Sequence, residues 1–177
     1  TNDCAMCILS PKLVEAGSHP RIHIITYSEV KEISGSPPCF SVKIEKKPRY
    51  INEDICTGCG VCTSKCPVKI PDPYNRGLSK TKCISIPFAQ AIPGIPLIHR
   101  ESCRYFTTGK CRVCEKFCEL KAIDFDQEEK SFNIEVGSII FACGTREFNA
   151  QLKGEYGYKI YPDVLTSPEF ERILSAS

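Results

Sequence analysis

The chain has 177 residues, a formal net charge of +2 at pH 7 and 13 cysteines. Its length suffices for one ordinary domain or two small ones, and its small, dispersed positive charge argues against binding to nucleic acid. An odd number of cysteines is unusual for a disulfide framework, and neither a signal segment nor an apolar stretch long enough to span a bilayer is present. We therefore predict a cytoplasmic protein with reduced thiols that is not inserted in a membrane.

The first 47 residues predict a short helix followed by strands. Ser10 suits a helix N-cap, Pro11 the first helical position and Gly17 the helix end. The apolar run at 22–25, Ile-His-Ile-Ile, indicates a buried strand. Over residues 40–44 apolar and polar side chains alternate, which is the pattern of a strand with one solvent-exposed face.

The strongest motif follows, in the run Cys56-Thr-Gly-Cys59-Gly-Val-Cys62-Thr-Ser-Lys-Cys66-Pro67. A tight loop that contains Gly58 and Gly60 lets the first three thiolates reach different irons of one cubane. The fourth cysteine lies on the next helical turn and points elsewhere, and in two-cluster ferredoxins it binds the other cluster. This spacing predicts a [4Fe–4S] cluster.

A second motif is Cys103-Arg-Tyr-Phe-Thr-Thr-Gly-Lys-Cys111-Arg-Val-Cys114-Glu-Lys-Phe-Cys118. Its last three cysteines repeat the spacing of the first motif, but Cys103 lies eight positions before Cys111 rather than three. The extra residues can bulge out while both ends stay at the iron. Glu119 also stands where the first motif has a proline.

The two motifs together predict two [4Fe–4S] clusters, each with three ligands from one motif and one from the other. The predicted ligand sets are Cys56, Cys59, Cys62 and Cys118, and Cys103, Cys111, Cys114 and Cys66. We expect such clusters to pass single electrons. The alternative is a non-redox interaction module stabilised by four-cysteine zinc sites, which are usually two CxxC pairs separated by a longer loop.

Cysteines outside the two motifs allow more than one interpretation. Free cysteine is often buried as a small apolar side chain, which is what we expect of Cys39 and Cys83. The pair Cys4-Ala-Met-Cys7 could supply half of a further metal site or a dithiol.

The strand pattern returns at residues 132–136 and is followed by an apolar run at 139–142 that indicates another buried strand. Strands of one sheet must be adjacent, so the cysteine-rich stretch 48–130 is predicted to be an insertion between paired strands. Ser167-Pro168-Glu169 begins a final helix that extends to about Leu174. The chain then ends without a tail-like composition, as expected of part of a longer polypeptide.

Five segments carry a resemblance to a known family, the A subunits of heterodisulfide reductase. They are Cys4-Ala-Met-Cys-Ile-Leu-Ser-Pro-Lys-Leu-Val-Glu, Lys47-Pro-Arg-Tyr-Ile, Ile86-Pro-Phe-Ala-Gln-Ala, Gly109-Lys-Cys-Arg-Val-Cys-Glu-Lys-Phe-Cys and Tyr156-Gly-Tyr-Lys-Ile-Tyr-Pro-Asp-Val-Leu-Thr-Ser. Together they extend over nearly the whole chain and are more specific than the ferredoxin spacing alone.

The resemblance implies an α+β fold in which a two-cluster ferredoxin-like domain, residues 48–130, is inserted into a fragment of another domain. That fragment, residues 1–47 and 131–177, would belong to an α/β FAD-binding domain similar to thioredoxin reductase. The resemblance also implies FAD in the intact protein or assembly, and partners that are other iron–sulfur and flavin subunits of a redox complex. The chain would then be an electron-transfer part of an oxidoreductase, without catalytic residues of its own.

The resemblance further implies where FAD would lie. Ala142, Cys143 and Gly144 occupy the Ala-Thr-Gly position that approaches FAD in such flavoproteins, with Thr145 beside it and cysteine in place of threonine. The strand near Val30 would lie close to the adenine. The sequence contains no glycine-rich turn for the FAD pyrophosphate, so we expect this chain alone to lack half of the flavin site.

Overall fold

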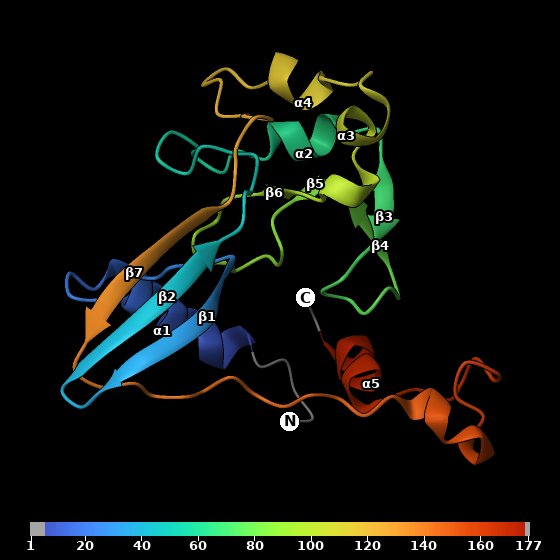
Figure 1. Cartoon of the computed structure of the whole chain (residues 1–177). Helices are drawn as coiled ribbons and strands as arrows, with labels where there is room; N and C mark the ends of the chain where they lie inside the picture. The colour runs from blue at the N-terminus through green and yellow to red at the C-terminus, as the bar shows by residue number, and fades with distance from the viewer. Residues whose placement is uncertain (1–5, 176–177) are drawn as a thin grey trace.

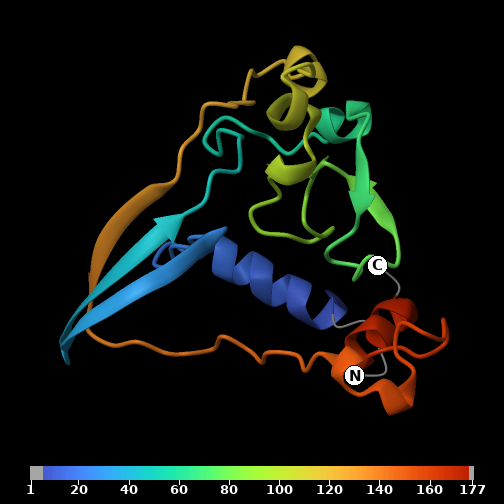
Figure 2. The ribbon, with the colours of Figure 1, turned by 45° about the vertical axis from the view of Figure 1, so that its right-hand side comes forward.

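The computed structural model describes residues 6–175, and its largest sheet has three antiparallel strands in the order β1-β2-β7 (Figures 1 and 2). The strands are β1 (Ser28–Ser36), β2 (Cys39–Lys46) and β7 (Lys130–Val136). In β2, Val42 pairs with Ile134 and Ile44 pairs with Phe132. The predicted adjacency of these two strands is confirmed, and Val42 and Ile44 are buried as the alternating pattern requires.

Short elements fill the chain between β2 and β7, in the upper part of Figure 1. They are α2 (Val61–Lys65), β3 (Lys69–Pro71), β4 (Lys80–Lys82), β5 (Ile84–Ser85), β6 (Leu97–Ile98), the 3₁₀ turn η1 (Arg100–Ser102), α3 (Arg104–Thr108) and α4 (Val113–Lys116). The main hydrophobic cluster lies here, between Tyr50 and Phe125 in the sequence, with Ile51, Ile84 and Ile98 among its most buried members. This region therefore has a core of its own.

The two ends of this region lie side by side. Ile51 and Ile123 form an antiparallel bridge. The N–H of Asn52 donates to the carbonyl of Ala122 at 2.7 Å, and the N–H of Asp124 donates to the carbonyl of Tyr50 at 3.0 Å. The chain thus leaves the sheet at β2, folds around its own core and returns beside its starting point to enter β7.

One helix lies near each end of the described chain. α1 (Met6–Ser18) overlaps the sheet in Figure 1, and Figure 2 shows it between the sheet and α5 (Ser167–Leu174). The helix at 167–174 is confirmed, with Thr166 as its N-cap. The predicted start of the first helix is wrong, because the helix already includes Met6 and has Pro11 inside it. Proline there removes one backbone donor, which this largely exposed helix tolerates.

Two apolar runs differ from their predicted structure. Residues 22–25 form no strand and their isoleucines are exposed, and the predicted strand at 139–142 is an irregular segment with Ile140 92% and Phe141 74% exposed. Both runs lie outside the sheet, which has three strands in the described residues, so neither gains a partner to cover it. The 3₁₀ turns η2 (Ala150–Leu152) and η3 (Gly154–Tyr156) follow. Within residues 6–175 no helix is both long and apolar enough for a membrane span.

Candidate metal centres

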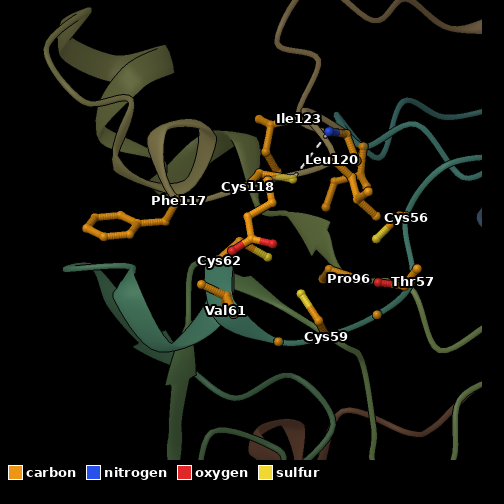
Figure 3. Close-up of a pocket in the computed structure, with 15 residues that line it drawn as sticks. Cys56, Thr57, Cys59, Val61, Cys62, Pro96, Phe117, Cys118, Leu120 and Ile123 are labelled. Atoms are coloured by element: carbon orange, nitrogen blue, oxygen red, sulfur yellow. Dashed lines mark hydrogen bonds between the residues drawn. The ribbon is translucent and has the colours of Figure 1, made fainter.

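The cysteine loop of the first motif lines the first cavity, which has a volume of about 420 Å³. Cys56, Cys59 and Cys62 line it, together with Cys118 of the second motif. Figure 3 shows the four side chains around a common space, with other lining residues that are mostly apolar. The first predicted ligand set is therefore gathered around a space that suits a metal cluster, although the ligand role of each residue stays a prediction.

Local backbone geometry explains how this loop presents its thiols. Gly58 and Gly60 have φ angles of +69° and +76°, which turn the chain sharply between cysteines. α2 starts directly after Gly60 and buries Cys62, and Cys66 is its C-cap. On the opposite wall, the N–H of Ala122 donates a hydrogen bond to Cys118 Sγ at 3.2 Å, shown dashed in Figure 3. Such a donor stabilises a thiolate.

The second cavity adjoins the first across α2 and is much tighter, at about 20 Å³. It is lined by the whole second predicted ligand set, Cys66, Cys103, Cys111 and Cys114. A cluster would need more room than this. η1 and α3 flank Cys103, and Tyr105 and Phe106 of α3 pack against the core through ring contacts with Phe125 and Tyr50. Four thiols are nevertheless the donor set that a [4Fe–4S] cluster requires.

Burial raises the pKa of one predicted ligand in each cavity. It raises the pKa of Cys62 and raises that of Cys114 to about 12, and neighbouring cysteines add to both shifts. These two thiols therefore stay protonated until a positive centre stabilises their thiolates. Metal binding here must release protons, so we expect it to weaken as the pH falls.

The arrangement of the thiols also bears on the zinc alternative. A zinc site needs four ligands within one tetrahedral coordination sphere. In the part of the chain that the structure describes, no three His, Cys, Asp or Glu side chains are placed to hold one metal ion. In the first cavity, the four thiols surround about 420 Å³, which is more room than one zinc ion needs.

The remaining cysteines have different surroundings. Cys83 is buried as predicted, whereas the prediction for Cys39 is wrong, because Cys39 is exposed at the first position of β2. Cys7 is exposed, and its potential partner Cys4 lies outside the described residues. Sequence reasoning missed that Cys83 lines the second cavity, since no motif spacing links it to the other four cysteines.

The residues predicted to contact FAD lie on two separate elements. Val30 is an exposed residue of β1, level with Ile44 and Phe132 in the sheet register. Residues 142–145 belong to the exposed segment that leaves β7 beyond Val136 and runs toward α5 (Figure 1). Their contact with FAD stays a prediction.

Comparison with known proteins adds to this geometry. The family described as "4Fe-4S binding domain" matches residues 49–72, which contain the first motif. The chain is 46% identical over 175 residues to the iron-sulfur A subunit of the CoB--CoM heterodisulfide reductase of Methanocaldococcus jannaschii, covering 99% of this chain and 26% of the relative.

Two further relatives match over the whole chain. The A subunit of the H(2):CoB-CoM heterodisulfide,ferredoxin reductase of Methanothermobacter thermautotrophicus is 46% identical over 177 residues, with 100% of this chain and 26% of the relative covered. The A subunit of the Ferredoxin/F(420)H(2)-dependent CoB-CoM heterodisulfide reductase of Methanosarcina acetivorans is 42% identical, with 100% and 22% covered. The chain thus spans about a quarter of the length of these curated relatives.

Proposed function

Because the chain belongs with the heterodisulfide reductase A subunits, of which it corresponds to one section, we propose that it passes electrons through two [4Fe–4S] clusters. It would do so within a larger oxidoreductase that also contains flavin. The observation that carries this proposal is the mixed origin of each cysteine set. Cys118 lines the cavity of the first motif, and Cys66 lines the cavity of the second.

This exchange of cysteines supports two adjacent clusters. Cys62 lies on the short helix α2, and Cys66 is the C-cap of the same helix. The two cysteines nevertheless line different cavities. Two sites joined by one helical turn suit electron transfer, in which a [4Fe–4S] cluster gains or loses one electron at a time. The chain would contribute the thiolates, the apolar walls and the hydrogen bond to Cys118 that together set the reduction potential.

The flavin and the partners belong to the same proposal. The residues that the resemblance assigns to FAD, Val30, Ala142, Cys143, Gly144 and Thr145, lie outside the core of the cysteine-rich region. We propose that FAD binds beside Cys143 and Gly144 in a longer polypeptide or assembly, and that other iron–sulfur and flavin subunits exchange electrons with the two clusters.

Iron and acid-labile sulfide analysis tests the clusters directly. After anaerobic reconstitution we expect about eight iron and about eight sulfide per chain, because two cubanes contain that many atoms. Absorbance in the visible range that is bleached by dithionite should accompany them. Bound zinc without sulfide would refute the proposal, and a reproducible value near four iron would remove the second cluster.

Substitution of Cys66 tests the exchange between motifs. Cys66→Ala should remove or alter the cluster held by Cys111 and Cys114 and leave the one held by Cys56 and Cys59 intact, because Cys66 lines the second cavity. Cys118→Ala is the matched variant and should affect the first cluster. Electron paramagnetic resonance of the reduced variants distinguishes the two losses. The reverse assignment would show that each motif binds its own cluster.

A further inference from the structure

The second cavity is lined by five cysteines, one more than a [4Fe–4S] cluster needs. Besides Cys66, Cys103, Cys111 and Cys114, its wall contains Cys83. Cys83 is 1% exposed and belongs to the main hydrophobic cluster. A thiol in this position is enclosed with the predicted ligands and shielded from solvent.

Hydrogen bonds hold Cys83 in place. Its N–H donates to the carbonyl of Val68 at 3.0 Å, and its carbonyl accepts from the N–H of His99 at 2.9 Å. Its thiol donates to the carbonyl of His99 at 3.2 Å. The thiol S–H is a weak donor, and the carbonyl that accepts from it is neutral. Breaking this hydrogen bond therefore costs little when the sulfur binds a metal instead.

Among the predicted ligands, Cys83 lies close to Cys103. Burial raises the pKa of the Cys83 thiol to about 12, and the nearness of Cys103 and Cys66 adds to that shift. Cys103 also stands apart from the other predicted ligands in its sequence position. It is partly buried between η1 and α3, and its spacing from Cys111 departs from that of the first motif.

We propose that Cys83 is a reserve ligand of the second cluster, able to replace Cys103 at the same iron. In the exchange, the bond between Cys103 Sγ and iron breaks and a bond between Cys83 Sγ and iron forms. The thiol proton of Cys83 passes to Cys103, so charge and electron count stay unchanged. This inference rests on the proposed second cluster, and it predicts that the site tolerates the loss of Cys103.

Iron and sulfide analysis of the reconstituted chain tests the exchange. The wild type and Cys83→Ala should both hold about eight iron, because Cys103 serves in each. Cys103→Ala should also keep about eight iron, with a changed electron paramagnetic resonance spectrum. The double variant Cys103→Ala/Cys83→Ala should fall to about four iron, because no spare thiol remains. Cys83→Val, which fills the space better, provides a second version if the alanine variant folds poorly.

Cys39 provides the matched control, because it is an exposed cysteine on β2. Cys103→Ala/Cys39→Ala should therefore keep about eight iron. A wild type with about four iron would refute the proposed second cluster itself. A wild type with about eight iron and a Cys103→Ala variant with about four would overturn the reserve role of Cys83 alone. Full iron retention in the Cys103/Cys83 double variants would overturn it as well, since another group would then be the replacement.

Discussion

At the residue scale, two glycines of the first cysteine loop have similar backbones and different surroundings. Gly58 and Gly60 have φ angles of +69° and +76°. A Cβ added at Gly58 would collide with the carbonyl oxygen of Gly94, whereas one added at Gly60 meets nothing within 4 Å. The loop around Gly94 therefore packs directly on the first cysteine loop.

Alanine substitution at each glycine should separate backbone strain from collision. Gly60→Ala should lower the free energy of unfolding by about 1–2 kcal/mol, the cost of a left-handed backbone for a residue with a Cβ. Gly58→Ala should cost roughly 1–3 kcal/mol more, because backbone atoms must shift. Circular dichroism during thermal unfolding measures both. Equal effects of the two substitutions would contradict the close packing against Gly94.

At the element scale, Glu169 anchors α5 to the preceding segment. Its carboxylate accepts hydrogen bonds from the Thr166 N–H at 2.8 Å, the Thr166 hydroxyl at 2.9 Å and the Tyr158 hydroxyl at 2.8 Å. Burial alone would raise the pKa of Glu169, but these bonds and Lys159 outweigh it and lower the pKa to about 2.

The lowered pKa predicts how α5 responds to acid. The carboxylate stabilises the helix fully above its ordinary pKa of 4.5, and this contribution is lost as the pH falls toward about 2. Protection of α5 amides from hydrogen exchange, corrected for intrinsic rates, should therefore decrease over this range. Glu169→Gln should weaken protection at neutral pH and remove most of the pH dependence. Glu171→Gln, at an exposed position of the same helix, should change neither.

Local signals explain which elements could be predicted from the sequence. The start of the helix at 167–174 is indicated by the residues at the start itself, a proline in the first turn and a glutamate that completes a capping box. The alternation of apolar and polar residues at 40–44 and 132–136 likewise predicts two strands, which pair with each other. The apolar runs at 22–25 and 139–142 were predicted wrongly because burial depends on a covering surface that periodicity does not reveal. The same holds for the site. Motif spacing indicated the eight cysteines that line the two cavities, but Cys83 reaches the second through tertiary packing.

At the scale of the whole molecule, the cysteine-rich region has the features of an independent unit. Its hydrophobic cluster lies entirely between Tyr50 and Phe125, and the Ile51–Ile123 bridge holds its ends together. A fragment of residues 48–130 should therefore fold and bind the same number of irons as the whole chain. Iron analysis and circular dichroism of the two proteins, reconstituted side by side, provide the comparison. A fragment that stays unfolded beside a loaded whole chain would show that β1, β2 and β7 are needed.

Flavin binding should depend on more than this chain. The helix N-terminus and glycine-rich turn that bind a pyrophosphate supply much of the affinity for FAD, and the sequence has no such turn. We expect the isolated chain to retain little FAD after gel filtration, as measured by flavin absorbance of the acid-released supernatant. A longer polypeptide that supplies the turn should retain it. Tight, stoichiometric FAD on the 177-residue chain would refute the proposed division of the flavin site.

The pairing of β2 with β7 leads to an expectation about the order of folding. Lys46 and Lys130 face each other in the register, yet they are roughly 80 positions apart in sequence, so pairing them first would require closing a long, entropically costly loop. When the core of the cysteine-rich region folds, the bridge between Ile51 and Ile123 closes most of that loop. Lys46 and Lys130 are then held close together, and pairing them costs little further entropy. We therefore expect the cysteine-rich region to fold early, and β2 to pair with β7 afterwards, from Lys46 and Lys130 toward Phe40 and Val136. A variant that slows the folding of the core should delay the appearance of the distant sheet by the same factor.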